Sequence, residues 1–96
     1  MADYWQPTPT DDAPEIAPGT VLIFTADEMR YIDHKIRLRL DRVRDDLAAF
    51  YADHVWLQGW SLSADGSPSG WIQILARIDA IPQALERGTH GAAVHP

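Results

Sequence analysis

The stretch Ala26–His54, ADEMRYIDHKIRLRLDRVRDDLAAFYADH, determines which fold the sequence predicts. Thr25 and Glu28 at its start form a capping-box pattern, and no glycine or proline occurs between residues 26 and 58. Its apolar residues recur at steps of three or four, as on one face of an α-helix: Met29, Ile32, Ile36, Leu40, Val43, Leu47 and Phe50. We therefore predict one long amphipathic helix over 26–54.

The same stretch contains a competing pattern. Ile36, Leu38 and Leu40 alternate with charged residues, as the residues of a half-buried β-strand do. The helical spacing on both sides favours the helix, which leaves Leu38 off the main apolar face. Together with Tyr31, seven residues earlier, Leu38 predicts a second apolar seam on this helix. Such a seam suits a further helix or a second subunit.

The predicted helix is long for a chain of 96 residues. At about 1.5 Å per residue it would span roughly 43 Å. A compact chain of this size has a diameter of only about 32 Å. We therefore expect the helix to kink or to lie against another chain.

Shorter elements flank this stretch. Residues 20–24, TVLIF, are apolar and largely β-branched, which predicts a short strand. Residues 55–62 and 71–78 favour β structure and flank the turn formers ADGSPSG, which predicts a β-hairpin. The alternative for this region is a pair of helices, the first of which continues the long helix through Trp60.

A short helix is predicted near the C-terminus. Pro82 interrupts the preceding pattern, and residues 83–87 with Gly88 behind them indicate a short capped helix. The predicted fold class is therefore α+β, with a short N-terminal strand, one long amphipathic helix, a β-hairpin and a short C-terminal helix.

The chain divides into an acidic arm over 1–19, a single small domain over 20–88 and a tail over 89–96. The acidic arm contains four prolines, four acidic residues and no basic residue, so it cannot form a core alone. Its Tyr4 and Trp5 are residue types that anchor contacts. Three alternatives stay open: the arm folds back on its own domain, crosses to a neighbouring subunit, or is a free tail.

Charges are unevenly distributed along this chain of net charge −6. The first fifteen residues carry a charge of −4, whereas a basic belt with a local charge of +4 lies between residues 30 and 44. The basic belt consists of Arg30, Lys35, Arg37, Arg39, Arg42 and Arg44. Complementary patches steer association, so the belt is suited to a protein partner or to the arm of a neighbouring copy. The alternatives are a solvated helix face and a nucleic-acid contact, which the net charge disfavours.

Four tryptophans are many for 96 residues, and Trp56, Trp60 and Trp71 cluster on the predicted hairpin. A small hairpin cannot bury all three against one helix, so we expect at least one at an interface. Stacking on single-stranded nucleic acid is disfavoured, because no lysine or arginine lies within ten residues of Trp60 in the sequence.

Residues that could support catalysis or metal binding are weakly patterned. The motifs YIDH at 31–34 and YADH at 51–54 each place an aspartate beside a histidine. On one helix the two copies would lie about 30 Å apart, so we interpret their similarity as chance. His90 and His95 have no further ligand nearby in the sequence, and no nucleotide-binding or hydrolase motif occurs. We predict no enzyme, no cofactor, no metal site and no small-molecule substrate.

The leading hypothesis is a non-catalytic structural or assembly subunit that acts through contacts with itself or another protein. Small acidic proteins with arms are frequent in phage particles and their assembly machinery, and this association favours such a role. The alternatives are an acidic regulator that occludes a basic surface of a partner, and a nucleic-acid binder that uses the arginine-rich helix. Without a signal peptide or membrane span, we expect a cytoplasmic or virion-associated protein. The predicted partner-binding residues are Tyr4, Trp5, Tyr31, Arg37, Leu38, Arg39, Arg42 and Trp60.

Overall fold

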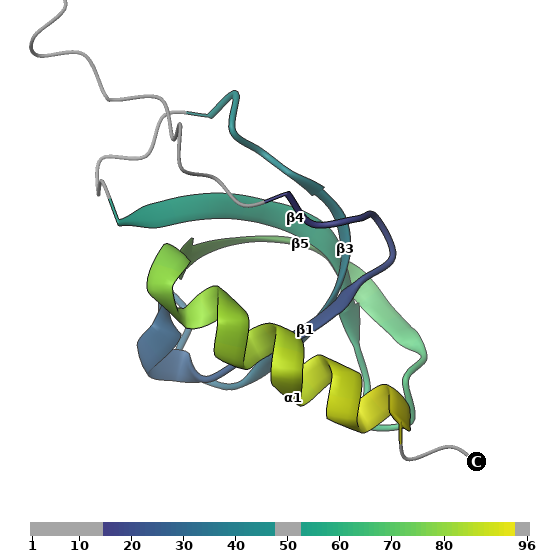
Figure 1. Ribbon diagram of the computed structural model, residues 1–96. Helices are drawn as coiled ribbons and strands as arrows, with labels where there is room; N and C mark the ends of the chain where they lie inside the picture. Colours follow the sequence, from purple (N-terminus) through teal and green to yellow (C-terminus); the bar gives the residue numbers. More distant parts are fainter. Residues whose placement is uncertain (1–14, 48–52, 94–96) are drawn as a thin grey trace, which may run out of the picture.

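A computed structural model describes residues 15–47 and 53–93, with side chains up to residue 89. The described chain is mostly an antiparallel sheet of five strands that curls into half a barrel, with a helix at its C-terminal end (Figure 1). The elements in chain order are β1 (Val21–Phe24), the 3-10 helix η1 (Ala26–Glu28), β2 (Met29–Arg30), β3 (Ile36–Val43), β4 (His54–Leu62), β5 (Pro68–Arg77), the 3-10 helix η2 (Ile78–Ala80) and α1 (Ile81–Ala93).

The curl of the sheet follows from its strand order, which is β1-β3-β4-β5-β2 with every neighbouring pair antiparallel. β1 and β2 are consecutive in the chain, yet they lie at opposite edges of the sheet. Only Thr25 and η1 separate them. Because this link is so short, the sheet has to bend until its two edges approach each other.

The long helix predicted over 26–54 does not exist, so the α+β prediction built on it is wrong. The described part of this stretch forms η1, β2, a connecting loop and β3, and residues 48–52 lie outside the described residues. In β3, the buried Leu38 alternates with the partly exposed Arg37 and Arg39. The strand-like alternation is the correct signal, because β3 pairs with β1 on one side and β4 on the other.

The hairpin predicted for residues 55–78 is present as β4 and β5, which excludes the alternative of two helices there. Its pairing runs from His54 opposite Arg77 to Leu62 opposite Pro68. In the connecting turn, the Asp65 carboxylate accepts hydrogen bonds from the Ser67 backbone N–H and hydroxyl at 3.0 and 2.7 Å. The short strand predicted at 20–24 also corresponds to β1.

The core lies between the inner face of the sheet and α1, which crosses the open side of the curl (Figure 1). The sheet places alternate residues on this face, and α1 adds residues from one side of its first turns. The buried core residues are Leu22, Phe24, Met29, Ile36, Leu38, Leu40, Val55, Leu57, Ile74, Ala76, Ala80, Ile81 and Ala84.

α1 also covers the edge of β1 that β3 leaves open. A Cβ atom on Gly88 would lie 1.9 Å from the carbonyl oxygen of Val21, so only a glycine permits this approach. Arg87 Nη1 donates a hydrogen bond of 3.0 Å to the carbonyl oxygen of Ile23. Unpaired strand edges invite pairing with other chains, and α1 protects this one. The predicted helix over 83–87 is therefore too short, and Gly88 lies within the helix and does not cap it.

Candidate functional site

The outer face of the sheet carries an exposed pair of tryptophans. Trp60 on β4 lies directly opposite Trp71 on β5. Their ring centroids are 5.2 Å apart with an interplanar angle of 79°, an edge-to-face contact. The two residues nevertheless remain 40% and 50% exposed. A rigid sheet thus presents two adjacent aromatic rings to solvent.

Two arginines of the basic belt lie on the same face. Arg39 is opposite Trp60 in the pairing of β3 with β4. Arg37 follows the same alternation on β3, and its Nη1 donates to the carbonyl oxygen of Ala64 at 3.4 Å. The sequence around Trp60 holds no basic residue, but the neighbouring strand supplies one. We call Arg37, Arg39, Trp60 and Trp71 the Trp–Arg face.

A chain of hydrogen bonds crosses the strands next to the Trp–Arg face. Gln58 Nε2 donates to Asp41 Oδ2 at 2.9 Å. Gln58 Oε1 in turn accepts from Arg44 Nη1 at 2.7 Å and from Gln73 Nε2 at 3.2 Å. These polar side chains hold one another across β3, β4 and β5, so they form an ordered border beside the tryptophans.

Two further members of the basic belt, Arg42 and Arg44, pair with one carboxylate. Arg44 forms an ion pair with Asp46 at 2.9 Å, and its hydrogen bonds lower the pKa of that carboxyl to about 2. Arg42 pairs with the same carboxylate at 3.4 Å. Arg37 and Arg39 are the belt residues on the Trp–Arg face. Arg42 is opposite Gln58 in the pairing of β3 with β4, beside the Trp–Arg face, and its part in partner binding stays a prediction.

A second candidate is an open pocket of about 460 Å³ where η1 and β2 meet the start of β4 and the end of β5. Tyr31 beside it has a φ of 69°, the one positive φ of a non-glycine residue in the described chain. Strained backbone is often found at functional sites, which makes the pocket a second candidate site beside the Trp–Arg face. The pocket is lined by Asp27, Met29, Arg30, Tyr31, Asp53, His54 and Arg77.

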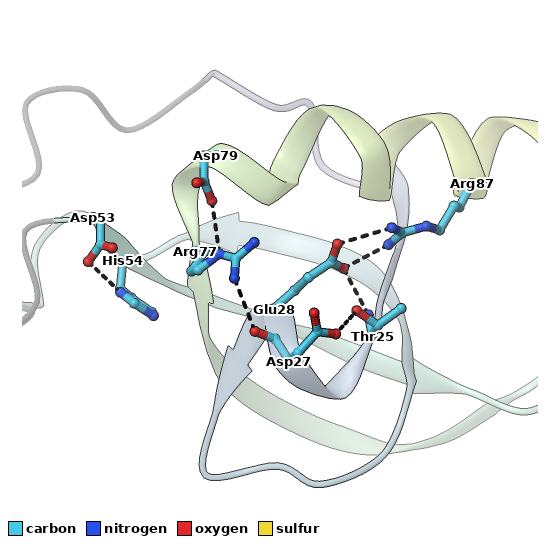
Figure 2. Close-up of polar contacts among 8 residues, drawn as sticks. All are labelled: Thr25, Asp27, Glu28, Asp53, His54, Arg77, Asp79 and Arg87. Atoms are coloured by element: carbon cyan, nitrogen blue, oxygen red, sulfur yellow. Dashed lines mark hydrogen bonds and ion pairs between the residues drawn. The ribbon is translucent and has the colours of Figure 1, made fainter.

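The charged groups around this pocket contact one another (Figure 2). The buried His54 has its Nδ1 2.8 Å from Asp53 Oδ1, and this contact lowers the pKa of Asp53. Arg77 Nε donates to Asp79 Oδ1 at 3.0 Å, and Arg77 Nη1 donates to the backbone carbonyl of Asp27 at 3.3 Å. The lining contains both basic and acidic side chains, so the pocket shows no clear preference for a ligand of one charge.

The structure revises the interpretation of the YIDH and YADH motifs. Tyr31 of the first motif and Asp53–His54 of the second line the same pocket, so the calculated separation of about 30 Å fails together with the helix. Asp33 and His34 are exposed and contact each other at 3.2 Å, and they do not line the pocket. The described residues contain no cluster of three or more potential metal ligands.

The remaining predicted partner-binding residues are dispersed. Leu38 is completely buried in the core, so the predicted apolar seam through Leu38 and Tyr31 does not exist. Tyr31 is 79% exposed at the pocket, away from Leu38 on the sheet's inner face. Tyr4 and Trp5 lie outside the described residues.

Sequence reasoning missed Trp71 as a member of the site. The signal that could have found it is the hairpin itself, because pairing across the turn places Trp71 opposite Trp60. The position of Arg39 opposite Trp60 could not be predicted without knowing that β3 is the other neighbour of β4.

Comparison with protein-family models, with curated proteins and with solved structures finds no match to this chain. Within the described part of the chain, none of the helices has the length and apolar character that crossing a membrane requires. The Trp–Arg face and the pocket are therefore the features from which a function can be inferred.

Proposed function

We propose that this protein is a non-catalytic structural or assembly subunit that binds another protein through the Trp–Arg face. The observation that carries the proposal is the exposed edge-to-face pair of Trp60 and Trp71 beside Arg39. Tryptophan and arginine are the residue types most often found as hot spots in protein interfaces. Here they are held on a paired sheet, so little side-chain and backbone freedom remains to be lost on binding.

The size of the exposed aromatic surface supports this function. About half of each ring system is accessible, which leaves roughly 200 Å² to be covered by a partner. At about 25 cal/mol per Å² this corresponds to roughly 5 kcal/mol, before the cost of association is subtracted. Two tryptophans can therefore anchor an interface whose remaining contacts contribute mainly complementarity.

The same face makes nucleic acid the second candidate. Arg39 lies opposite Trp60, and a cation beside a stacking ring is the combination that single-stranded nucleic acid uses. The net charge of −6 opposes this candidate, since phosphate contacts supply most of such affinity. The hypothesis of an acidic regulator finds no support at this face, whose charged members are arginines.

The test compares the full chain with the double variant Trp60→Ser/Trp71→Ser. The matched control is Gln73→Ser, which changes an exposed polar side chain on the same outer face. Sedimentation velocity over a range of concentrations measures self-association, and co-purification from the producing cells detects another subunit. We expect association that the double variant loses and the control retains.

Two results would contradict the proposal. Association that is equal in the wild type and the double variant would exclude the Trp–Arg face as the binding surface. Binding to single-stranded oligonucleotides with a steep salt dependence, without any protein association, would favour the second candidate.

A further inference from the structure

The described chain enters the sheet next to β3, where the Gly19 N–H donates to the carbonyl oxygen of Leu40, and the residues before it have the chemistry to bind the Trp–Arg face. We propose that the acidic arm covers the Trp–Arg face of its own chain, so that a partner has to displace it. This inference rests on the proposed function, because it adds a competitor for the same surface. It identifies the occupant as a proline-rich, acidic segment of this protein.

The point of attachment is given by a turn at the start of β1. The Thr20 N–H donates to the carbonyl oxygen of Ala17 at 3.2 Å, and Gly19 between them has a φ of 91°. Pro18 followed by such a glycine is the sequence of a type II turn. The Gly19 N–H also donates to the carbonyl oxygen of Leu40 at 2.7 Å. The arm is therefore anchored one residue from Arg39.

The arm is long enough to cross the face. Strands in a sheet lie about 4.8 Å apart, so β5 is roughly 14 Å from β1 across β3 and β4. The residues that precede Glu15 could span up to about 46 Å when extended. A tether of this kind holds the arm at a millimolar effective concentration, which favours binding within one chain over binding between dilute copies.

The chemistry of the arm complements that of the face. Asp11 and Asp12 are opposite in charge to Arg37 and Arg39, and such pairs fix orientation more than they add affinity. Pro7 and Pro9 favour the extended polyproline conformation, and aromatic-lined surfaces bind that conformation because it is already ordered. The exposed Trp60–Trp71 pair is an aromatic surface of this kind.

A covered face has a consequence for partner binding. Only the fraction of molecules with an open face is competent, so the apparent affinity for a partner is reduced by that fraction. Changes that weaken the arm should therefore tighten partner binding without altering the binding surface. The arm would act as an intramolecular competitor.

The chain contains no cysteine, so a single introduced cysteine can carry a nitroxide spin label without side reactions. We would label Thr10→Cys in the full chain and record the indole N–H signals of Trp60 and Trp71 by NMR. The expected result is strong paramagnetic broadening of both signals. A label on Asp79→Cys, an exposed position of η2 just beyond Arg77 and roughly 20 Å along β5 from Trp71, serves as the control.

The charge contacts are tested with Asp11→Lys/Asp12→Lys, which should reduce the broadening by roughly tenfold if the open state becomes dominant. Raising the salt from about 50 to 500 mM should also reduce the broadening, because salt screens these charge contacts. The matched control Asp33→Lys/Asp45→Lys makes the same change in net charge at exposed positions of the domain, and it should leave the broadening in place.

Three outcomes would overturn the inference. One is the absence of broadening from the Thr10→Cys label. Another is an equal loss of broadening in Asp11→Lys/Asp12→Lys and in the control Asp33→Lys/Asp45→Lys. The third is broadening in a mixture of spin-labelled unenriched protein with unlabelled ¹⁵N-enriched protein, which would assign the arm to a second copy.

Failure of the inference is distinguishable from failure of the proposed function. If Trp60→Ser/Trp71→Ser abolishes protein association but the spin label causes no broadening, the proposed function stands and the inference fails. If the label broadens both tryptophan signals but association is insensitive to the double variant, the arm binds and the proposed function fails. If the proposed function and the inference both hold, the Asp11→Lys/Asp12→Lys variant should bind the partner roughly tenfold more tightly than the wild type does.

Discussion

Leu38 and Arg39 are neighbours on β3, yet one is completely buried and the other lies opposite Trp60 on the far side of the sheet. The same division applies to the hairpin. On its inner face Leu57 and Ile74 are 0% and 1% exposed, whereas on its outer face the tryptophans are 40% and 50% exposed. Strand alternation alone assigns a residue to one face or the other. Stability should therefore reside on the inner face and binding on the outer one.

The largest expected effect comes from placing a charge on the inner face. Leu38→Glu buries a carboxylate with no partner. We expect the free energy of unfolding to fall by at least about 4 kcal/mol, which is enough to unfold a small domain. Urea titration followed by circular dichroism measures the change. Arg39→Glu is the matched control on the outer face and should stay within about 0.5 kcal/mol of the wild type. A folded Leu38→Glu variant would contradict the buried strand and would instead agree with the helix seam predicted from sequence.

One ion pair interrupts the apolar interior where α1 meets η1. Glu28 is 7% exposed, and it accepts hydrogen bonds from Arg87 Nη1 at 2.7 Å and Nη2 at 3.0 Å (Figure 2). The Thr25 N–H donates to the same carboxylate at 2.9 Å. These contacts, with the hydrogen bonds from Arg87 as the largest cause, lower the pKa of Glu28 from 4.5 to about 2. Thr25 and Glu28 thus cap the short η1 and not a long helix.

Acid should therefore destabilise the fold through this group. Because the pKa of Glu28 is lower in the folded chain, its contribution is present above pH 4.5 and is lost as the pH falls toward 2. The lowered pKa of Glu28 corresponds to at most about 3 kcal/mol of folding stability. Urea unfolding at several pH values should show a flatter pH dependence for Glu28→Gln than for the wild type. Identical slopes would show that the ion pair does not form in solution.

The next effect concerns close packing between β3 and β4. A Cβ on Gly59 would lie 2.1 Å from the carbonyl oxygen of Arg39, where the pairing of β3 shifts register. Gly59→Ala should cost about 1–3 kcal/mol, since backbone has to move. Gly70→Ala is the control, because nothing lies within 4 Å of its Cβ position, and alanine is the better strand residue. Thermal unfolding should show a lower melting temperature for Gly59→Ala and no lower melting temperature for Gly70→Ala.

The smallest effect on stability is expected at the Trp–Arg face. A double-mutant cycle with Trp60→Ala and Trp71→Ala should give a coupling energy of about 0.5–1.5 kcal/mol, as for other edge-to-face pairs. Both single variants should remain folded, since the rings are half exposed. A loss of several kcal/mol in either variant would make the pair part of the core and would remove the distinction between the two faces.

Local signals were sufficient for part of this fold. The strand at 20–24 and the hairpin were predictable because turn residues and β-forming runs lie next to each other in the sequence. The long helix failed because Met29, Ile36 and Leu40 recur at helical spacing although they belong to two different strands. The loop between those strands contains no glycine or proline, and Tyr31 takes the left-handed backbone conformation that a glycine usually provides.

The candidate site was predictable residue by residue but not as a surface. Arg37, Arg39 and Trp60 were predicted from charge and aromatic content, but on a helix and a hairpin whose relation was unknown. Their proximity depends on β3 pairing with β4, and Trp71 joins them through the hairpin register. Leu38 was assigned to an interface because the helical interpretation left it without a place in the core.

The sequence by itself determined the charge of −6, the separation of the acidic arm from the basic belt, and the alternation that sorts residues between two faces. Only the tertiary structure decided which strands pair, that β1 and β2 occupy opposite edges, and that α1 covers the edge of β1. The physical reason is that helical and strand periods are local properties of a chain, whereas strand pairing joins segments that are distant in sequence. A run such as IRLRL is compatible with either period until β1 and β4 supply its hydrogen-bond partners.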